Sequence, residues 1–492
     1  MTSPFPNSYW LEPRRILCGE YPRDFDDLED HQGMTAILQA GARVFVDLTE
    51  KGELKPYSTI ALTTAAALDI DPDELEFHRH PIRDVSVPKS NAEMHGILRA
   101  IRLARHRNKP VYLHCWGGRG RTGTVAGCVL RDLFLLQGDD ALASLNERWQ
   151  ACAKSEWSDS PETDEQRGFV RSFDPVEPLS KQVRAAVLGA AVGDALGVPV
   201  EFQEREIRKK DPVTTMRGYG THNQPAGTWS DDTAMIVATM AGFLKADDYS
   251  TDAVMKEFSL WLGEAKHTPH GKVFDVGHAT LEAITRFLRG TSAKRCGGTS
   301  EWSNGNGSLM RILPVALAFA NEPELIDKAS EMSALTHAHE RSRMACAFYC
   351  LVVSELLHAS AIEAAIAFAW ETMDTRWEFS LEERALFDAW HPDRLLARDF
   401  TEIRSSGYVV DTLESALWVN AHHDSFADAV LQAVNLGDDT DTTACVAGGL
   451  AGLIHGESGI PEEWLDVLVS KREIVSLANQ FSDFCQLQFR PD

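Results

Sequence analysis

The chain has 492 residues, of which 44% are hydrophobic and 25% are charged, and this length predicts roughly two or three domains. The formal net charge of −25 argues against non-specific binding to nucleic acid or to an anionic membrane, because both favour a basic surface. No run of about 18 apolar residues occurs, so no transmembrane helix is expected. The start, MTSPFPNSYWLEPRR, lacks the pattern of a signal peptide. The nine scattered cysteines include no C-x-x-C pair, which indicates free thiols in a reducing cytoplasm.

Short apolar runs alternate with helical patterns in the first part of the chain. The segments 42–48 and 110–115 are typical of buried strands, whereas 91–107 and 124–136 are typical of helices. This alternation predicts an α/β domain, with a central parallel or mixed sheet flanked by helices, which we place at residues 1–175. Four arginines of the first of these helices are expected to form a solvated face: Arg99, Arg102, Arg105 and Arg107.

A polar segment with two prolines, SFDPVEPLSKQ at 172–182, indicates a linker. Few convincing strands follow it, and the chain beyond the linker is predicted to form an all-α domain at residues 181–492. Alanine-rich helical patterns cover most of that region: 183–196, 233–245, 251–262, 278–289, 341–358, 361–372 and 444–455.

The stretch HCWGGRGRTG at 114–123 places a cysteine and a glycine-rich loop between a predicted strand and a predicted helix. Three glycines allow several backbone N–H groups to point at one anion, and Arg121 adds a planar donor that fits a phosphate. The same positive field favours the thiolate of Cys115, which is then an in-line nucleophile towards a bound phosphoryl group. The alternative is a small buried cysteine in a turn. The coincidence of glycines, arginine and helix start favours the nucleophile.

Other side chains near this loop have predicted roles. The hydroxyl of Thr122 is placed to contact the sulfur and assist the second step. Asp84 lies on a loop between two prolines in HPIRDVSVP at 80–88, and it is the candidate general acid for the leaving group. A loop-capping aspartate is the alternative for that residue. His114 is expected to orient the loop rather than to transfer protons.

This pattern, His114-Cys115-x5-Arg121-Thr122 with Asp84 upstream, resembles the cysteine-dependent protein tyrosine and dual-specificity phosphatases. The resemblance implies a phosphocysteine intermediate on Cys115, proton donation by Asp84, and no cofactor. The glycine before Arg121 and the additional cation Arg119 resemble members that accept substrates other than phosphotyrosine. The resemblance assigns phosphate binding, together with Arg121, to the loop Trp116, Gly117, Gly118, Arg119 and Gly120.

Two acidic clusters, GTWSDDTAM at 227–235 and NLGDDTDTTA at 435–444, each open a predicted helix. Helix capping is the alternative explanation, but the five aspartates of these runs are more than two caps need. Carboxylates packed with hydroxyl groups repel one another unless a cation lies among them. Oxygen ligands select a hard ion such as Mg²⁺ or Mn²⁺, and a pair of such ions can activate a water.

Two glycine-containing stretches accompany these clusters. GAAVGDALGVPVEF at 189–202 reads as a small-residue helix that ends near the acid Glu201. SNGNGSLMR at 303–311 reads as a polar loop ahead of a helix, which suits a diphosphate at a helix N-terminus.

Five motifs in this order resemble the ADP-ribosyl-acceptor hydrolases, the family of dinitrogenase-reductase-activating glycohydrolase: GDALG at 193–197, SDDT at 230–233, NGNGS at 304–308, THAH at 336–339 and GDDTDT at 437–442. The resemblance implies an all-α ADP-ribosylglycohydrolase-like fold with two divalent cations, Mg²⁺ or Mn²⁺. Glu201 falls at an acid that gates or assists the site. The implied metal ligands are Ser230, Asp231, Asp232, Asp439, Asp441 and Thr442.

The resemblance also implies a surface for ADP-ribose, formed by Gly305, Asn306, Gly307, Ser308 and His337. The chain departs from the expected motifs at two positions. Ser230 replaces a threonine and keeps a hydroxyl ligand, and Asp438 replaces a glycine and adds a charge.

The sequence therefore predicts a cytoplasmic, bifunctional hydrolase without a membrane partner. Its expected substrates are a phosphomonoester and an ADP-ribosylated acceptor, which can be a protein, a nucleic acid or a small molecule. The rival interpretation is a non-catalytic antitoxin or sensor that binds ADP-ribose or phosphate with only one active domain. The presence of nucleophile, acid and metal ligands together favours the enzyme, and turnover of an aryl phosphate and of an ADP-ribosyl peptide discriminates between the two.

Overall fold

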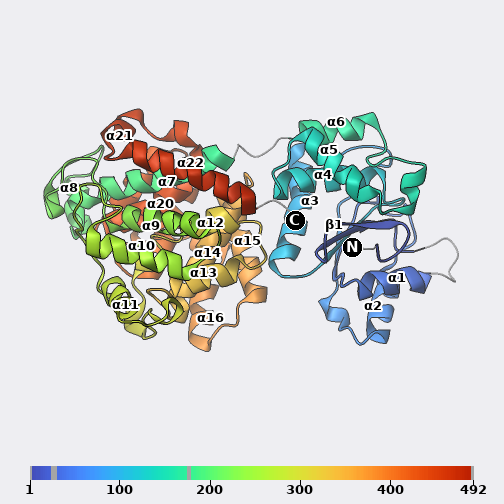
Figure 1. Ribbon diagram of the computed structural model, residues 1–492, viewed down its shortest axis with the longest axis horizontal. Coiled ribbons are helices and arrows are strands. Elements are labelled where there is room, and N and C mark those ends of the chain that lie inside the picture. Colours follow the sequence, from blue (N-terminus) through green and yellow to red (C-terminus); the bar gives the residue numbers. More distant parts are fainter. Residues whose placement is uncertain (1–2, 24–29, 174–178, 489–492) are drawn as a thin grey trace. The chain divides into compact units, whose positions relative to one another are not determined.

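The computed structural model describes residues 3–23, 30–173 and 179–488 (Figure 1). The chain forms two compact units, one built mainly from the residues before 176 and the other mainly from those after it. Part of the predicted linker, 174–178, lies outside the described residues. The exact domain limits, 1–175 and 181–492, therefore stay a prediction.

The first unit is an α/β fold around one five-stranded sheet, as predicted. The strand order is β1-β2-β5-β3-β4, with β1 and β2 antiparallel and the other neighbours parallel. Its strands are β1 (Ser8–Glu12), β2 (Ile16–Gly19), β3 (Val44–Asp47), β4 (Glu76–Arg79) and β5 (Val111–His114). Its helices are α1 (Asp30–Gln39), α2 (Ser58–Ala67), α3 (Asn91–His106), α4 (Gly120–Leu133), α5 (Gly138–Trp149) and α6 (Asp164–Ser172).

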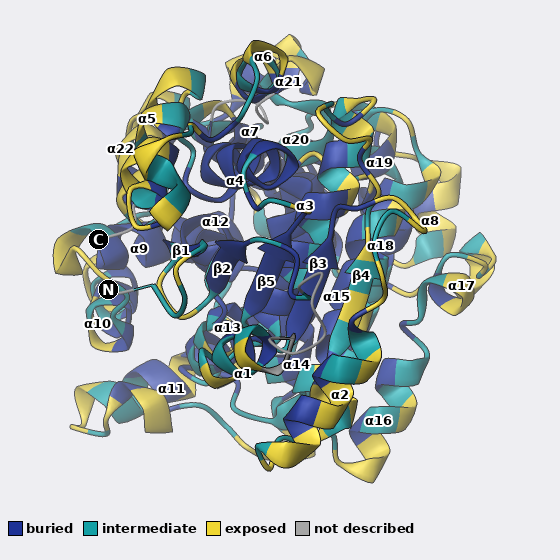
Figure 2. Ribbon diagram, turned by 90° about the vertical axis from the view of Figure 1, so that its right-hand side faces the viewer, coloured by how far each residue is buried: buried dark blue, intermediate teal, exposed yellow. Residues whose placement is uncertain are grey.

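Both faces of the sheet are covered, so the central strands are apolar at successive positions. In β3, Val44 and Val46 pack with α3 and α4, whereas Phe45 points to the opposite face and packs with α1 and α2. Successive side chains of a strand alternate between faces, which explains this division. Figure 2 shows β2, β5 and β3 buried, with α3 and α4 on one side of them and α1 and α2 on the other.

The predicted solvated arginine face of α3 is wrong for two of its members. Arg102 is 3% exposed and its Nη1 lies 2.9 Å from Asp132 Oδ2 on α4. Arg105 is 6% exposed and its Nε donates to Glu12 Oε2 at 2.8 Å. These arginines have carboxylate partners on neighbouring elements, which helical periodicity along α3 does not reveal.

The second unit is helical, and its described residues contain only isolated β-bridges in place of strands. The predicted all-α class is therefore confirmed. Each helix expected from the alanine-rich patterns forms, with longer bounds at α7, α9, α10, α15 and α20. The helices are α7 (Leu179–Gly197), α8 (Arg205–Lys210), α9 (Asp231–Ala246), α10 (Thr251–Glu264), α11 (His278–Leu288), α12 (Leu313–Phe319), α13 (Leu325–Ser333), α14 (Glu340–Leu356), α15 (Ile362–Arg376), α16 (Leu381–Asp388), α17 (Pro392–Leu395), α18 (Val409–His422), α19 (Phe426–Val434), α20 (Thr440–His455), α21 (Glu462–Val467) and α22 (Lys471–Gln488).

Helices α7 and α20 pack backbone against backbone. A Cβ atom on Gly193 would lie 2.0 Å from the carbonyl oxygen of Ala444, and one on Gly448 would lie 2.2 Å from that of Gly189. Only glycine permits such an approach. The contact brings the GDALG motif of α7 against the first turn of α20, where Asp441 lies.

The segment Leu179–Val200 is long and apolar enough to cross a membrane by length and composition, and 94% of its most apolar window is buried inside the unit. A central helix of a folded core has the same properties. All nine cysteines are buried and free, in agreement with the expected thiols.

Candidate active sites

The phosphate-loop candidate follows β5 and ends where α4 begins at Gly120. Gly118 has a φ of 71°, and a Cβ atom there would lie 2.5 Å from the carbonyl carbon of Gly19 on β2. Glycine is required on both counts. The loop borders a pocket of 240 Å³ whose lining includes Cys115, Gly117, Arg121 and Asp84. The structure thus brings the predicted nucleophile, loop, cation and acid together.

Arg121 is 2% exposed and is held by two acids. Glu53 accepts two hydrogen bonds, from Nη1 at 2.8 Å and from Nη2 at 2.6 Å, and Asp84 Oδ1 lies 3.0 Å from Nη2. This arginine lowers the pKa of Glu53, chiefly through the hydrogen bond between them. A bidentate pair fixes the plane of a guanidinium, and Nε of Arg121 has no partner among the described residues.

The buried hydroxyl of Thr122 likewise has no hydrogen-bond partner in the described part of the chain. Cys115 is 3% exposed at the floor of the pocket. His114 Nε2 lies 2.9 Å from the Tyr57 hydroxyl, and burial lowers the pKa of His114 to about 4. A neutral, buried His114 fits the expected orienting role better than proton transfer.

Two exposed tryptophans border the pocket, Trp116 at 47% and Trp157 at 68% exposure. Arg119 pairs with Glu162 at 3.4 Å, and Lys154 Nζ donates to the carbonyl of Gly117 at 3.0 Å. Lys154, Trp157 and Glu53 were not predicted as site residues, because they come from segments far from the loop in the chain and carry no local motif.

The second candidate site lies at the starts of α9 and α20. Ser230 caps α9, and its hydroxyl donates to Asp232 Oδ2 at 3.1 Å. The Thr442 hydroxyl of α20 donates to the same oxygen at 3.3 Å. Asp439 Oδ2 accepts a hydrogen bond of 3.0 Å from Asn306. Segments 210 residues apart therefore meet around these carboxylates.

Three carboxylate oxygens of this cluster are buried without a hydrogen-bond donor among the described residues: Asp232 Oδ1, Asp439 Oδ1 and Asp441 Oδ2. Buried polar atoms are rarely left without a partner. Burial and the negative charges of neighbouring acids raise the pKa values of Asp231, Asp232 and Asp441. Oxygen donors of this kind match the ligands of Mg²⁺ or Mn²⁺, so the residues present fit a divalent cation.

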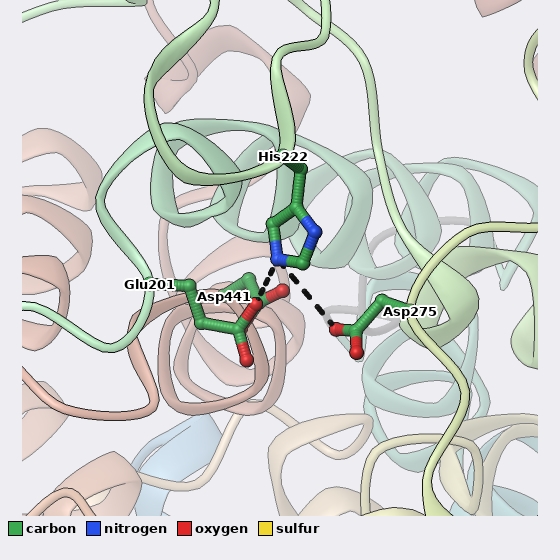
Figure 3. A group of neighbouring side chains, drawn as sticks. All are labelled: Glu201, His222, Asp275 and Asp441. Carbon is green, nitrogen blue, oxygen red and sulfur yellow. Dashed lines mark hydrogen bonds and ion pairs between the residues drawn. The ribbon is translucent and has the colours of Figure 1, made fainter.

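A histidine-containing group adjoins the cluster. One ligand atom from each of Glu201, His222, Asp275 and Asp441 lies within 4.8 Å of the others. Figure 3 shows the His222 ring directed at Glu201, with which it is hydrogen-bonded, and at Asp275, whose Oδ2 is 4.0 Å from Nε2. Burial raises the pKa of Glu201 to about 7, and the hydrogen bond to Glu201 raises that of His222. His222 and Asp275 were missed, because His222 ends a single 3-10 turn, Gly220–His222, and Asp275 lies in a loop, and neither segment has a recognisable sequence pattern.

Asp194 supports the start of α9. It belongs to the GDALG motif at 193–197, and the sequence did not indicate a role for it. It is fully buried and accepts hydrogen bonds from the Ser230 N–H at 2.9 Å and from the Thr233 N–H and hydroxyl at 3.0 and 2.6 Å. Burial raises its pKa to about 6. Asp194 thereby fixes the backbone that presents Asp231 and Asp232.

The NGNGS loop lies beside His337. A Cβ atom on Gly305 would be 3.5 Å from His337 Nε2, and one on Gly307 would be 3.0 Å from Cε1. Asn306 connects the loop to the acids through Asp439. The hydroxyl of Ser308 is buried and accepts from Ser333 at 3.0 Å, so this side chain holds the loop from behind.

A cysteine loop on an α/β fold and a carboxylate cluster in a helical fold define a two-domain hydrolase. A sequence model of the ADP-ribosylglycohydrolase family matches residues 175–491, and one described as Swiss Army Knife protein, DSP-PTPase phosphatase domain matches residues 6–166. The chain belongs to the ADP-ribosylglycohydrolase family and carries a DSP-PTPase phosphatase domain before the glycohydrolase domain.

Known ADP-ribosyl hydrolases and a related solved structure match more than half of the chain. The ADP-ribosylarginine hydrolase Tri1 of Serratia proteamaculans (strain 568) is 33% identical over 305 residues, 62% of this chain and 79% of that protein. The ADP-ribosyl-(dinitrogen reductase) glycohydrolase of Rhodospirillum rubrum is 32% identical over 292 residues, 58% of this chain and 90% of that protein. A solved structure described as an ADP-ribosylglycohydrolase-related protein complex has 29% identity and a TM-score of 0.53, covering 63% of this chain and 99% of that one.

Proposed function

We propose that this chain is a bifunctional hydrolase that removes ADP-ribose from an acceptor with its second unit and hydrolyses a phosphomonoester with its first. The removal of ADP-ribose is supported by the buried carboxylate oxygens without donors at Asp232, Asp439 and Asp441. The phosphomonoester hydrolysis is supported by Cys115, which lines one pocket together with Arg121 and Asp84.

Divalent cations, Mg²⁺ or Mn²⁺, would be held by Ser230, Asp231, Asp232, Asp439, Asp441 and Thr442. When bound, such ions supply a Lewis acid that stabilises negative charge and activates water. Asn306 orients Asp439, and Asp194 orients the start of α9. These two side chains are therefore proposed to fix the geometry of the ligands.

Glu201 is proposed to move the proton of the attacking water. Its raised pKa, about 7, allows it to gain and lose a proton near neutral pH. Water oxygen bonds to the anomeric carbon, the bond to the acceptor breaks, and the acceptor leaves with a proton. Gly305, Asn306, Gly307 and His337 are proposed to bind the rest of ADP-ribose, with Ser308 holding their loop.

We infer an arginine side chain as the acceptor. Two relatives are named ADP-ribosylarginine hydrolase. In addition, Phe202 is 67% exposed next to Glu201, its ring lies 6.0 Å from that of His222, and the Phe274 ring lies 5.5 Å from the same histidine. Guanidinium groups stack on aromatic faces and pair with carboxylates such as Asp275. Peptides that carry ADP-ribose on arginine or on serine test this directly, and faster release from serine would contradict it.

In the first unit, the Cys115 thiolate is proposed to attack phosphorus while the bond to the leaving oxygen breaks. Asp84 gives that oxygen a proton, and the loop N–H groups with Arg121 stabilise the transferring phosphoryl group. Water then attacks phosphorus, the phosphorus–sulfur bond breaks, and phosphate and the thiolate are released. Trp116 and Trp157 border the pocket where the leaving group would lie.

Two variants of the full chain test the assignment. Cys115→Ser should lower aryl-phosphate turnover by orders of magnitude and leave ADP-ribose release unchanged, because a hydroxyl is far less acidic than a thiol. Asp441→Asn should do the reverse, so each variant is the control for the other. A wild-type protein that binds ADP-ribose and phosphate but turns over neither substrate would instead support the sensor interpretation.

A further inference from the structure

The charged side chain of Arg311, three residues after the NGNGS loop at 304–308, has no part in the chemistry proposed above. Arg311 is fully buried, and its guanidinium lies over the Phe258 ring at 4.8 Å. No carboxylate pairs with it among the described residues, and its Nε and Nη1 lack hydrogen-bond partners there. Burial lowers the pKa of Arg311 to about 10, so it remains a cation at neutral pH. A buried charge is costly unless it is paired and hydrogen-bonded, so the few polar contacts of Arg311 matter.

The polar contacts of Arg311 lead to His337. Its Nη2 donates to the Thr336 hydroxyl oxygen at 2.8 Å and to the Met332 carbonyl at 3.2 Å. That hydroxyl oxygen is in turn 2.8 Å from Nδ1 of His337. All three polar side chains are buried, with exposures of 0% for Arg311 and Thr336 and 2% for His337.

The chemistry of the three groups fixes the direction of these hydrogen bonds. A guanidinium can only donate, so the Thr336 oxygen accepts from Arg311. The hydroxyl proton of Thr336 then has one acceptor among the described residues, which is His337 Nδ1. A protonated Nδ1 would leave the hydroxyl proton buried without an acceptor, at a cost of about 1–3 kcal/mol. Nδ1 is therefore an acceptor, and the ring proton belongs on Nε2.

The protonated nitrogen borders the glycine loop. Nε2 is the atom 3.5 Å from the positions that a Cβ would take on Gly305 and on Gly307, and it has no partner among the described residues. Burial and the charge of Arg311 lower the pKa of His337 to about 3, which opposes a doubly protonated ring. A neutral ring with a proton on Nε2 offers that loop a donor and no acceptor.

We propose that Arg311 and Thr336 are positioning residues that hold His337 as the neutral Nε2–H tautomer, so that it donates a hydrogen bond to a diphosphate oxygen of ADP-ribose. The proposal rests on the proposed ADP-ribose site, and it assigns to the second unit a donor whose direction does not change across the physiological pH range. A purely structural Arg311 would anchor Met332 and leave the tautomer of His337 undetermined.

The tautomer is measurable in the full-length chain without turnover or metal. Histidine labelled with ¹⁵N gives distinct shifts for protonated and unprotonated ring nitrogens, and His337→Gln identifies the resonances of this ring. We expect an unprotonated Nδ1 and a protonated Nε2 that persist from about pH 5 to about pH 8, where an ordinary histidine titrates. A ring protonated on Nδ1, or one that titrates near its ordinary pKa, would overturn the proposal.

Thr336→Val and Thr336→Ser provide a matched pair, since valine keeps the shape and serine keeps the hydroxyl. Valine should release the tautomer preference and weaken ADP-ribose binding by about tenfold, the worth of one hydrogen bond, measured by calorimetry with Mg²⁺. Serine should restore both readouts to near wild type. Unchanged affinity in the valine variant would refute the positioning role. Failure of the wild type to release ADP-ribose from any acceptor would refute only the proposed function.

Discussion

Replacing Asp232 by asparagine should have opposite effects on stability with and without metal. In the structure, Asp232 Oδ2 accepts from Ser230 and Thr442, whereas the buried Oδ1 has no donor. The charge is surrounded by other acids that raise its pKa, burial being the larger cause. Asparagine keeps an acceptor for the two hydroxyls, removes the charge, and directs an amide N–H towards the remaining carboxylates.

The magnitude follows from the orphaned oxygen. A buried acceptor atom without a donor costs about 1–3 kcal/mol, and more when it belongs to a charged group. The variant should therefore be more stable than wild type by about that much in the absence of metal. For a large domain, 1 kcal/mol corresponds to a rise in Tm of about 2 °C, which predicts a rise of about 2–6 °C. At a Mg²⁺ concentration of about 100 times Kd, the free energy of unfolding of the wild type should rise by about 2.7 kcal/mol. The variant should show little of this metal-dependent increase.

The assay is thermal unfolding of the full chain, once in chelator and once in Mg²⁺ or Mn²⁺. The Tm of the transition that belongs to the second unit is compared between the two conditions. Asp438→Asn is the matched control, because Asp438 is exposed and its left-handed φ of 57° tolerates asparagine. The order of the Tm values should reverse between the two conditions for Asp232→Asn alone. A variant that melts below wild type in chelator, or that keeps the full metal-dependent shift, would refute this explanation of the cluster.

Other changes test the remaining geometry. Gly307→Ala should weaken ADP-ribose binding several-fold, because the new methyl group would lie 3.0 Å from the ring of His337. Gly305→Ala is the control, since its methyl group would meet only ordinary contacts at 3.5 Å. Calorimetry should show weaker binding for Gly307→Ala alone, and equal affinities of the two variants would count against the loop assignment. Glu53→Gln should raise KM for an aryl phosphate by about tenfold, because the bidentate pair that orients Arg121 is lost. An unchanged KM in steady-state kinetics would contradict that role of Glu53. In chelator, stability should fall as pH rises from about 4, near the pKa of an aspartate in the unfolded chain, to about 6, because Asp194 has a raised pKa, about 6, and keeps a proton that the unfolded chain has lost. Melting curves should show this slope, and Asp194→Asn should reduce it.

The phosphate loop was predictable because its parts are contiguous. Strand, cysteine, glycines and helix start follow one another within ten residues, and the fold requires Gly118 at a close approach to Gly19. Glu53 was not predictable in the same way. It lies 68 residues before Arg121 in the chain, and only the packing of the loop after β3 against α4 brings the two side chains together.

The carboxylate cluster was predictable in part, since both runs of aspartates open helices and their composition requires a cation or protons. The role of Asp194 depends on how α7 packs beside α9, which its small-residue pattern alone does not specify. His222 lies in a single 3-10 turn and Asp275 in a loop, and such short segments have no periodicity from which their position could be predicted. Thr336 and His337 were contiguous in THAH, but the buried cation Arg311 behind them is evident only from the folded core.

The central claim is that two independent hydrolytic chemistries share this chain, and a chelator tests it most directly. Aryl-phosphate hydrolysis and ADP-ribose release from an arginine-linked peptide are measured on the same full-length sample, before chelation, after it, and after Mg²⁺ or Mn²⁺ is restored. If only the carboxylate site uses a cation, as proposed, chelation should abolish ADP-ribose release reversibly and leave phosphate release unchanged. Release of ADP-ribose that persists in chelator, or loss of both activities together, would contradict the account.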